Sequence, residues 1–268
     1  MSAPAWSTNR PPRRSPISTP PLRLPGQSVD ERMSLLQAKI DDLLIAPLCF
    51  VVVAGYGWIQ WWTGYSVHPL IFTAVAIMTI LHAGKRIWSI RATIKNLQLG
   101  RDGERLVGQM LERLREKGYG VFHDIPGPSF NIDHVIVGPA GIFTIETKAR
   151  TKPKRGSSKI FYNGSSIQMA GKQAVQQPLR QVRAQARWLA AFLNRNSIIK
   201  YKVRPILVFP EWYVERTGRR NKDDVWVLNP KALDRFLDCE PHILSTTAAD
   251  SAAQILTQHY RETENEPA

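Results

Sequence analysis

A long stretch without a formal charge constrains the N-terminal third of this chain most strongly. Leu43–Trp62 contains 20 uncharged residues, about the length that a helix needs to cross the hydrocarbon core of a bilayer. A second uncharged run, residues 63–84, contains the shorter apolar stretch Leu70–Leu81, and tryptophans cluster at the junction. We therefore predict two transmembrane helices within residues 43–88. The alternative is a buried helical hairpin of a soluble domain.

Basic residues on either side of this stretch predict its orientation. Lys and Arg precede the first span and follow the second, whereas the connection Thr63–Pro69 has neither. The positive-inside rule then places both termini in the cytoplasm. We expect a multi-pass protein of the cytoplasmic (inner) membrane, with the lipid bilayer as one partner. Residues 1–29 are rich in Pro, Ser and Arg, and we predict a disordered cytoplasmic tail over residues 1–42.

A second feature is a predicted β-hairpin that carries charged residues. The β-rich runs Ile132–Val137 and Ile142–Lys148 flank the turn-forming tetrad Gly-Pro-Ala-Gly. Residues two apart share a face of a strand, so Glu146 and Lys148 project together, and antiparallel pairing brings Asp133 beside them. Two carboxylates next to an ammonium are costly for a fold. They are suited to binding Mg²⁺ and attacking a phosphodiester.

Four sequence blocks around this hairpin resemble the nuclease-related domain (NERD) family. They are Gly-Arg-Asp-Gly-Glu-Arg-Leu-Val (100–107), Asn-Ile-Asp-His-Val-Ile-Val-Gly-Pro-Ala-Gly-Ile-Phe (131–143), Ile-Glu-Thr-Lys-Ala (145–149) and Gln-Pro-Leu-Arg-Gln (177–181). Asp133 followed by Glu146-Thr147-Lys148 also matches the core motif of the restriction-endonuclease-like, PD-(D/E)XK, superfamily. The resemblance covers about residues 99–209. It implies an α/β fold with a mixed sheet flanked by helices, here preceded by the transmembrane hairpin.

The resemblance also implies roles for individual residues. Asp133, Glu146 and Glu104 would bind one or two Mg²⁺ or Mn²⁺ ions, which prefer oxygen ligands. Lys148 would orient or deprotonate a water molecule, or stabilise the transition state. Gln181 would position water or phosphate. The chain is therefore expected to hydrolyse phosphodiester bonds in DNA or RNA.

Glu104 has a second interpretation. It lies on a predicted helix over Ile94–Lys117, three residues before Val107, and so points toward an apolar stripe. A carboxylate there needs a partner or a metal ion. Alternatively, Glu104 is a first-turn residue that interacts with the helix dipole, with Asp102 as the cap. The spacing leaves both open, and the family resemblance favours the site.

The net charge predicts a polyanionic partner. The formal charge is +14, and Arg150–Lys222 contains 17 Lys and Arg against Glu211 and Glu215 alone. Such concentration favours nucleic acid, with DNA expected ahead of RNA. A solvated surface or attraction to anionic lipids is the alternative. The residues predicted to bind nucleic acid are Arg180, Arg183, Arg187, Lys152, Lys154 and Arg155.

The remaining pattern predicts the domain organisation. A helix with Pro178 in its first turn follows the hairpin, and further strands lie at Val203–Phe209 and Val225–Leu228. His123 and His134 lie near the acidic motif, but His134 alternates with Asp133 and is expected to face away from it. We assign residues 89–243 to the nuclease-like domain and 244–268 to a C-terminal helix and tail. Two cysteines in unrelated settings support neither a disulfide framework nor a zinc site.

These observations predict a membrane-anchored, Mg²⁺-dependent nuclease. The competing hypothesis is a catalytically silent membrane-tethered module that binds nucleic acid or acts as a scaffold.

Overall fold

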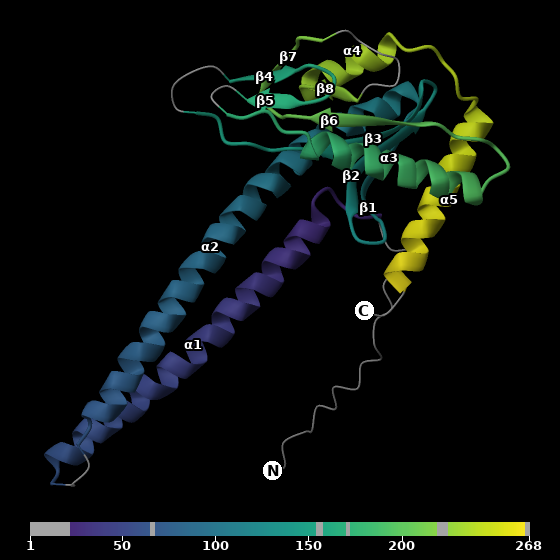
Figure 1. Ribbon diagram of the computed structural model, residues 1–268. Helices are drawn as coiled ribbons and strands as arrows, with labels where there is room; N and C mark the ends of the chain where they lie inside the picture. The colour runs from purple at the N-terminus through teal and green to yellow at the C-terminus, as the bar shows by residue number, and fades with distance from the viewer. Residues whose placement is uncertain (1–21, 65–67, 154–157, 170–171, 219–224, 266–268) are drawn as a thin grey trace, which may run out of the picture.

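A long helical hairpin projects from an α/β domain in the computed structural model (Figure 1). The structure describes residues 22–64, 68–153, 158–169, 172–218 and 225–265. Helix α1 (Gln27–Trp62) and helix α2 (Leu70–Glu112) run side by side, and their shared end lies far from the domain. Lys154 and Arg155, both predicted to bind nucleic acid, lie outside the described residues.

Both helices are longer than the sequence pattern indicates. Helix α1 begins at Gln27, so residues 27–42 are helical, and this corrects the predicted disordered tail over that range. Its start follows Pro25 and Gly26, where Gly26 has a φ of +71° that favours glycine. Helix α2 runs through the predicted domain boundary at residue 89 because no proline interrupts it between Leu70 and Glu112.

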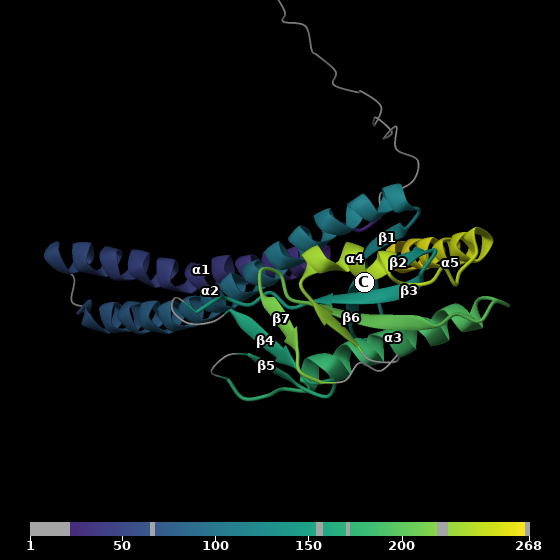
Figure 2. The same cartoon turned by 90° about the horizontal axis from the view of Figure 1, so that it is seen from above.

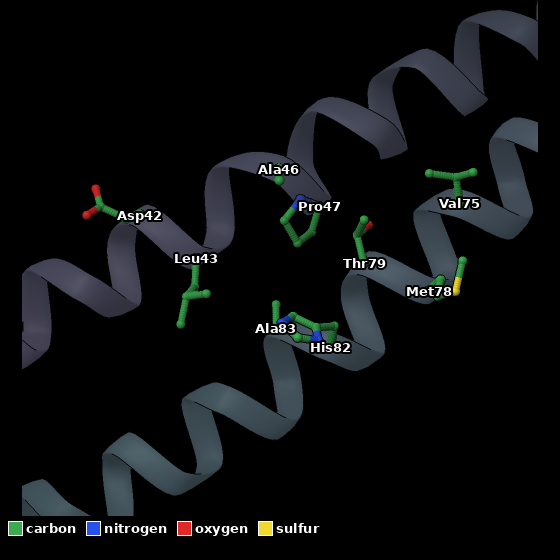
Figure 3. Close-up of a pocket in the computed structure, with 9 residues that line it drawn as sticks. All are labelled: Asp42, Leu43, Ala46, Pro47, Val75, Met78, Thr79, His82 and Ala83. Carbon is green, nitrogen blue, oxygen red and sulfur yellow. The ribbon is translucent and has the colours of Figure 1, made fainter.

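Among the described residues, two helices are long and apolar enough to cross a membrane, judged by length and composition. Only 6% and 11% of their most apolar windows are buried, unlike the core helix of a soluble domain. The helices leave a cavity of about 340 Å³ between them. Figure 3 shows Leu43 and Pro47 of α1 directed toward Thr79 and Ala83 of α2, whereas Asp42 points away. Side chains of both helices therefore line this cavity.

The domain is built on a five-stranded mixed sheet, which agrees with the expected α/β class. Its strand order is β1-β2-β3-β6-β8, with antiparallel pairing through β3 and parallel pairing beyond it. These strands are β1 (Gly120–Pro126), β2 (Asn131–Gly138), β3 (Gly141–Thr147), β6 (Val203–Val208) and β8 (Trp226–Leu228). A smaller sheet beside it has the order β5-β4-β7, from β5 (Ile167–Met169), β4 (Lys159–Tyr162) and β7 (Tyr213–Arg216).

Helices cover both faces of the main sheet (Figure 2). The end of α2, the short helix η1 (Arg113–Lys117), η2 (Pro230–Ala232) and α4 (Leu233–Asp238) lie on one face. Helix α3 (Gln177–Arg195) covers the other face and shares a core with α5 (Thr246–Asn265). Strand alternation supplies both cores: Ile145 faces α2 and α4, whereas Ile142 faces α3 and α5. Helix α5 therefore packs as part of the domain.

Candidate active site

The hairpin of β2 and β3 brings Asp133 and Thr147 together. Gly141 has a φ of +122° in the turn, a conformation that favours glycine, and the strands pair from Gly138↔Gly141 through His134↔Ile145. The same register places Asp133 opposite Glu146. The backbone N–H of Thr147 donates to Oδ2 of Asp133 at 2.7 Å. The predicted convergence of the two strand ends is therefore present in the fold.

Glu146 is buried and held by three donors. Its side chain is 3% exposed and faces α3. The Lys148 ammonium and the Gln181 amide donate to Oε1, the amide at 2.7 Å, and the Gln185 amide donates to Oε2 at 2.7 Å. Gln181 and Gln185 are one helical turn apart, so both amides project from the same side of α3. Gln185 was not among the predicted site residues, although its spacing of four from Gln181 was the available signal.

Lys148 follows the end of β3 and turns back toward Glu146. Its backbone N–H donates to the carbonyl of Val208 at 2.9 Å, which extends the parallel pairing with β6 by one residue. The side chain is 20% exposed and pairs with Glu146. Thr147 between them is buried on the other side of the strand, against Gly103 of α2. The alternation predicted for Glu146, Thr147 and Lys148 is therefore observed.

Glu104 of α2 lies within electrostatic range of Glu146 and Lys148. Burial, and after it the charges of Asp124 and Glu146, raise the pKa of Glu104 to about 7, whereas the charge of Lys148 opposes this shift. Glu104 lies well inside α2, and Asp102 pairs with Arg101 at 2.9 Å. The interpretation of Glu104 as a first-turn residue capped by Asp102 is therefore wrong, because α2 begins at Leu70, many turns before Glu104.

Carboxylates exceed the compensating cations in this group. Removal from water raises the pKa of the half-buried Asp133 well above its usual range, and Glu146 and Glu104 add to the shift. The N–H of Thr147 and the charge of Lys148 oppose it. The carboxylates of Asp133, Glu146 and Glu104, together called the carboxylate group below, are balanced by one ammonium, that of Lys148. An additional cation would relieve their repulsion.

The oxygen ligands at this site meet part of what Mg²⁺ requires. Within the described ranges, no group of three or more His, Cys, Asp or Glu side chains could hold a metal ion. The structure therefore does not bring Asp133, Glu146 and Glu104 together as a three-carboxylate site. Mg²⁺ commonly retains several waters and binds proteins through one or two carboxylates. Asp133 and Glu146 fit that requirement, and Glu104 lies within electrostatic range of them.

Two histidines form a separate buried pair. The Nδ1 atoms of His123 and His134 are 2.9 Å apart, and His123 Nε2 is 2.9 Å from Glu112 Oε1. Burial lowers the pKa of both imidazoles. His134 faces away from Asp133, as its alternation along β2 predicts, and the pair links β1, β2 and α2.

A cavity of about 450 Å³ opens beside Lys148. Arg150 and Lys172 also line it, together with apolar side chains of β5, α3 and Phe209. Three cationic residues therefore surround a hollow that borders the carboxylate group. Arg150 and Lys172 were not among the predicted site residues, since both lie in irregular segments without a helical or strand period.

The residues predicted to bind nucleic acid lie at separate places. Arg183 and Arg187 line a groove of about 540 Å³ with Lys202, between α3 and the start of β6. Arg180 donates to Gln176 at 3.0 Å, and Lys152 lies 3.8 Å from Glu211. The groove lies at the start of β3, at the end of that strand opposite to Glu146.

Comparison with known proteins supports a nuclease-related domain. The nuclease-related domain (NERD) family matches residues 99–210, a range that contains every residue of the carboxylate group. An uncharacterized protein of Bacillus anthracis is 35% identical over 81 residues, which cover 26% of this chain and 38% of that protein. The chain thus spans well under half the length of this curated relative. No solved structure matches the chain significantly.

Proposed function

We propose that this protein is a membrane-anchored, Mg²⁺-dependent nuclease that hydrolyses phosphodiester bonds in DNA or RNA. The observation that carries the proposal is the convergence of Asp133, Glu146 and Lys148 at one end of the β2–β3 hairpin. The match of residues 99–210 to a nuclease-related family supports the reaction class.

The residues around Glu146 suit a preorganised site. Gln181 and Gln185 fix the plane of the Glu146 carboxylate, so it needs no reorientation when a cation binds. Thr147 holds Asp133 through Oδ2, and no described residue donates to Asp133 Oδ1. Asp133 and Glu146 would hold the metal ion, with Glu104 in support. When bound, such an ion supplies an activated water and neutralises charge on the phosphate.

Lys148 would act on the reacting phosphate. Its ammonium is bonded to Glu146 on one side and lines the cationic cavity on the other. A positive charge fixed at that position stabilises the negative charge that develops in the transition state. The same ammonium can orient a water molecule at the edge of the carboxylate group.

Cationic surfaces support a polyanionic substrate. Arg150 and Lys172 extend the positive charge from Lys148 along the cavity. Arg183, Arg187 and Lys202 form a second cationic surface at the groove beside α3, at the other end of β3. Contacts of this kind bind phosphates without reading the base sequence, so we propose nucleic acid of broad sequence as the substrate, with DNA ahead of RNA.

The helical hairpin is proposed to anchor the domain in the cytoplasmic membrane. The apolar halves of α1 and α2 lie at the end remote from the domain (Figure 1). Basic flanks and a connection without Lys or Arg support an orientation with the domain and both termini in the cytoplasm.

A silent binding module is the second candidate. The ion pair between Lys148 and Glu146 partly neutralises the site, and the described residues include no three-ligand metal cluster. Such a module would keep the cationic cavity and groove and bind nucleic acid without turnover.

Cleavage by the full chain in lipid nanodiscs separates the two candidates. Single- and double-stranded DNA and RNA would be incubated with Mg²⁺, with Mn²⁺ or with a chelator. We expect metal-dependent cleavage by the wild type and a loss of at least about 100-fold in Glu146→Gln. Glu262→Gln, which changes an exposed carboxylate on α5, is the matched control and should cleave normally. Binding of nucleic acid without cleavage by the wild type would favour the silent module.

A further inference from the structure

A continuous chain of hydrogen bonds connects the first turn of α1 with Glu146. The backbone N–H and the hydroxyl of Ser28 donate to Oδ2 and Oδ1 of Asp124, both at 2.8 Å. Asn131 Nδ2 donates to Asp124 Oδ1 at 2.9 Å. The carbonyl of Asn131 accepts from Gln185 Nε2 at 3.2 Å, and the same nitrogen donates to Glu146 Oε2 at 2.7 Å.

Asp124 occupies an unusual backbone conformation at the centre of this chain. It lies within β1, is 3% exposed and has a φ of +52°, which L side chains rarely adopt. Its carboxylate also accepts from Arg23 at 3.2 Å, so the N-terminal segment provides three of the four donors that the described residues contribute. A strained conformation persists only where its surroundings fix it, and such positions concentrate at functional sites.

The orientation of Gln185 depends on Asn131. Both oxygens that face the Gln185 amide are acceptors, so the NH₂ group must point toward them. With one N–H donated to each acceptor, the rotation of the amide is fixed from both sides. The buried Gln185 Oε1 has no partner among the described residues. Leaving a buried acceptor unpaired costs stability, so holding Glu146 explains this residue better than filling the core does.

The N-terminal segment also packs against α2 next to the site. A β-carbon at Gly26 would lie 3.2 Å from Glu104 Oε2, and one at Gly108 would lie 2.5 Å from Pro25. Asp30 pairs with Arg101 at 3.0 Å. Residues 23–30, called the docking segment below, are therefore seated on α2 and β1 next to the carboxylate group.

We propose that Asp124 is a positioning residue that couples the docking segment to Glu146 through Asn131 and Gln185. With the segment seated, Asp124 holds Asn131, Asn131 orients the Gln185 amide, and the amide fixes Glu146. Release of the segment frees one end of this chain and loosens the carboxylate. The inference rests on the proposed nuclease function. It predicts that turnover depends on whether the docking segment at the start of α1 is seated on the domain.

Ser28→Ala tests the coupling with little change in volume. It removes one hydrogen bond to Asp124 and leaves the carboxylate group untouched. In nanodiscs we expect the kcat for cleavage of an oligonucleotide to fall about 3- to 10-fold with an unchanged KM, because the affected group acts on geometry and not on substrate binding. Ser28→Thr keeps the hydroxyl and should restore kcat. Ser34→Ala is the control, since the Ser34 hydroxyl donates only to Glu31 of its own helix at 2.8 Å.

A thermal-stability cycle tests the same coupling without catalysis. The melting temperatures of Ser28→Ala, Gln185→Met and the double variant would be compared in metal-free buffer. Coupling through Asp124 and Asn131 predicts that the double variant loses less than the sum of the single losses. Ser34→Ala combined with Gln185→Met should be additive.

The two measurements keep the inference separate from the proposed function. A wild type that does not cleave, together with a non-additive cycle, rejects the nuclease and keeps the hydrogen-bonded coupling. An active wild type with unchanged kcat in Ser28→Ala and an additive cycle overturns the positioning role of Asp124. A parallel loss in Ser28→Ala, Ser28→Thr and Ser34→Ala would overturn it too, because it would reflect general damage to α1.

Discussion

Gly103 of α2 lies so close to Ala149 that a β-carbon at position 103 would be 2.6 Å from the Ala149 Cβ. This contact is where α2 meets the chain as it leaves β3, one residue after Lys148. The absence of a side chain at Gly103 lets α2 approach the end of β3. This approach brings the neighbouring Glu104 within electrostatic range of Asp133 and Glu146.

Gly103→Ala should therefore displace α2. A β-carbon closer than 3.0 Å to its neighbour forces a shift, and overpacking of this kind costs roughly 1–3 kcal/mol, more than the gain in helix propensity. Gly100→Ala is the control, since nothing lies within 4 Å of a β-carbon there, and it should raise stability by about 0.5–1 kcal/mol. Thermal unfolding of both variants checks the pair, and equal stabilisation would show that the contact is loose.

Lys148→Ala should separate metal binding from turnover. Glu146 keeps both amide donors and loses its ammonium partner, so the affinity for Mn²⁺ should be preserved or increased. Turnover should fall by at least about 100-fold, because the proposed role of Lys148 lies in the transition state. Metal-induced shifts in melting temperature and cleavage rates would be measured together. Lys231→Ala, at an exposed pair with Glu211, should change neither. Normal cleavage by Lys148→Ala would exclude the proposed role.

Glu104 should make the metal-free protein less stable as the pH rises. Its folded pKa of about 7 exceeds its ordinary value of 4.5, so the folded state holds a proton that the unfolded chain releases between these values. Stability should fall as the pH rises from about 4.5 to 7, and Glu104→Gln should remove this fall. The gain at pH 8 should be on the order of 2 kcal/mol.

Glu112 provides the comparison of opposite sign. Hydrogen bonds from Arg115, and then from His123, lower the pKa of Glu112 despite some burial. Glu112→Gln should therefore reduce stability at neutral pH, where Glu104→Gln increases it. Melting temperatures from pH 5 to pH 8 in the presence of a chelator check both. A pH profile unaffected by Glu104→Gln would show that Glu104 titrates normally.

Charge reversal at Arg183 and Arg187 should weaken nucleic-acid binding equally for unrelated sequences. Each lost phosphate contact should reduce the slope of log K against log salt by about 1. Arg113→Glu with Arg235→Glu makes the same change in net charge on the opposite side of the sheet. Fluorescence anisotropy at several salt concentrations compares the two double variants. Equal losses would indicate a general effect of net charge and not a groove.

Reporter fusions test the proposed anchoring. Fusions after residue 30 and after residue 268 should both report a cytoplasmic location, because the basic residues lie on both outer flanks of the hairpin. A reporter inserted in the connection at residue 64 should report the opposite side. Recovery of the full chain in the soluble fraction would reject the anchor.

The sequence could predict what depends on short-range pattern. Alternation along two strands and a turn between them were sufficient to place Asp133 beside Glu146 and Lys148. Helical spacing likewise placed Gln181 on α3, but a single buried glutamine such as Gln185 looks the same as a solvated one. The part that escaped prediction depends on docking across the chain: Asp124 is important because Ser28, 96 residues away, reaches it.

Helix boundaries were the other gap. Hydropathy changes sharply after Gly84, and this change suggests an end to the helix. Hydrogen bonds within a helix do not depend on hydropathy, so α2 continues until η1 and Gly118. The polar part of α1 is also helical. Its Asp30 pairs with Arg101 and Arg105 of α2, and these contacts stabilise it beside that helix.

Because α2 is a single unbroken helix, it would fix the distance between the site of the proposed enzyme and the membrane surface. At 1.5 Å per residue, Glu104 lies about 28 Å along the helix axis from Lys85, the first basic residue after the apolar span. Under the proposed anchoring, with Lys85 at the lipid headgroups, α2 would hold the carboxylate group at that distance from the inner face of the membrane. Nucleic acid far from the membrane would then not reach the site. Location would then select the substrate: strands that enter the cell, or are held at its boundary, would be cut on arrival.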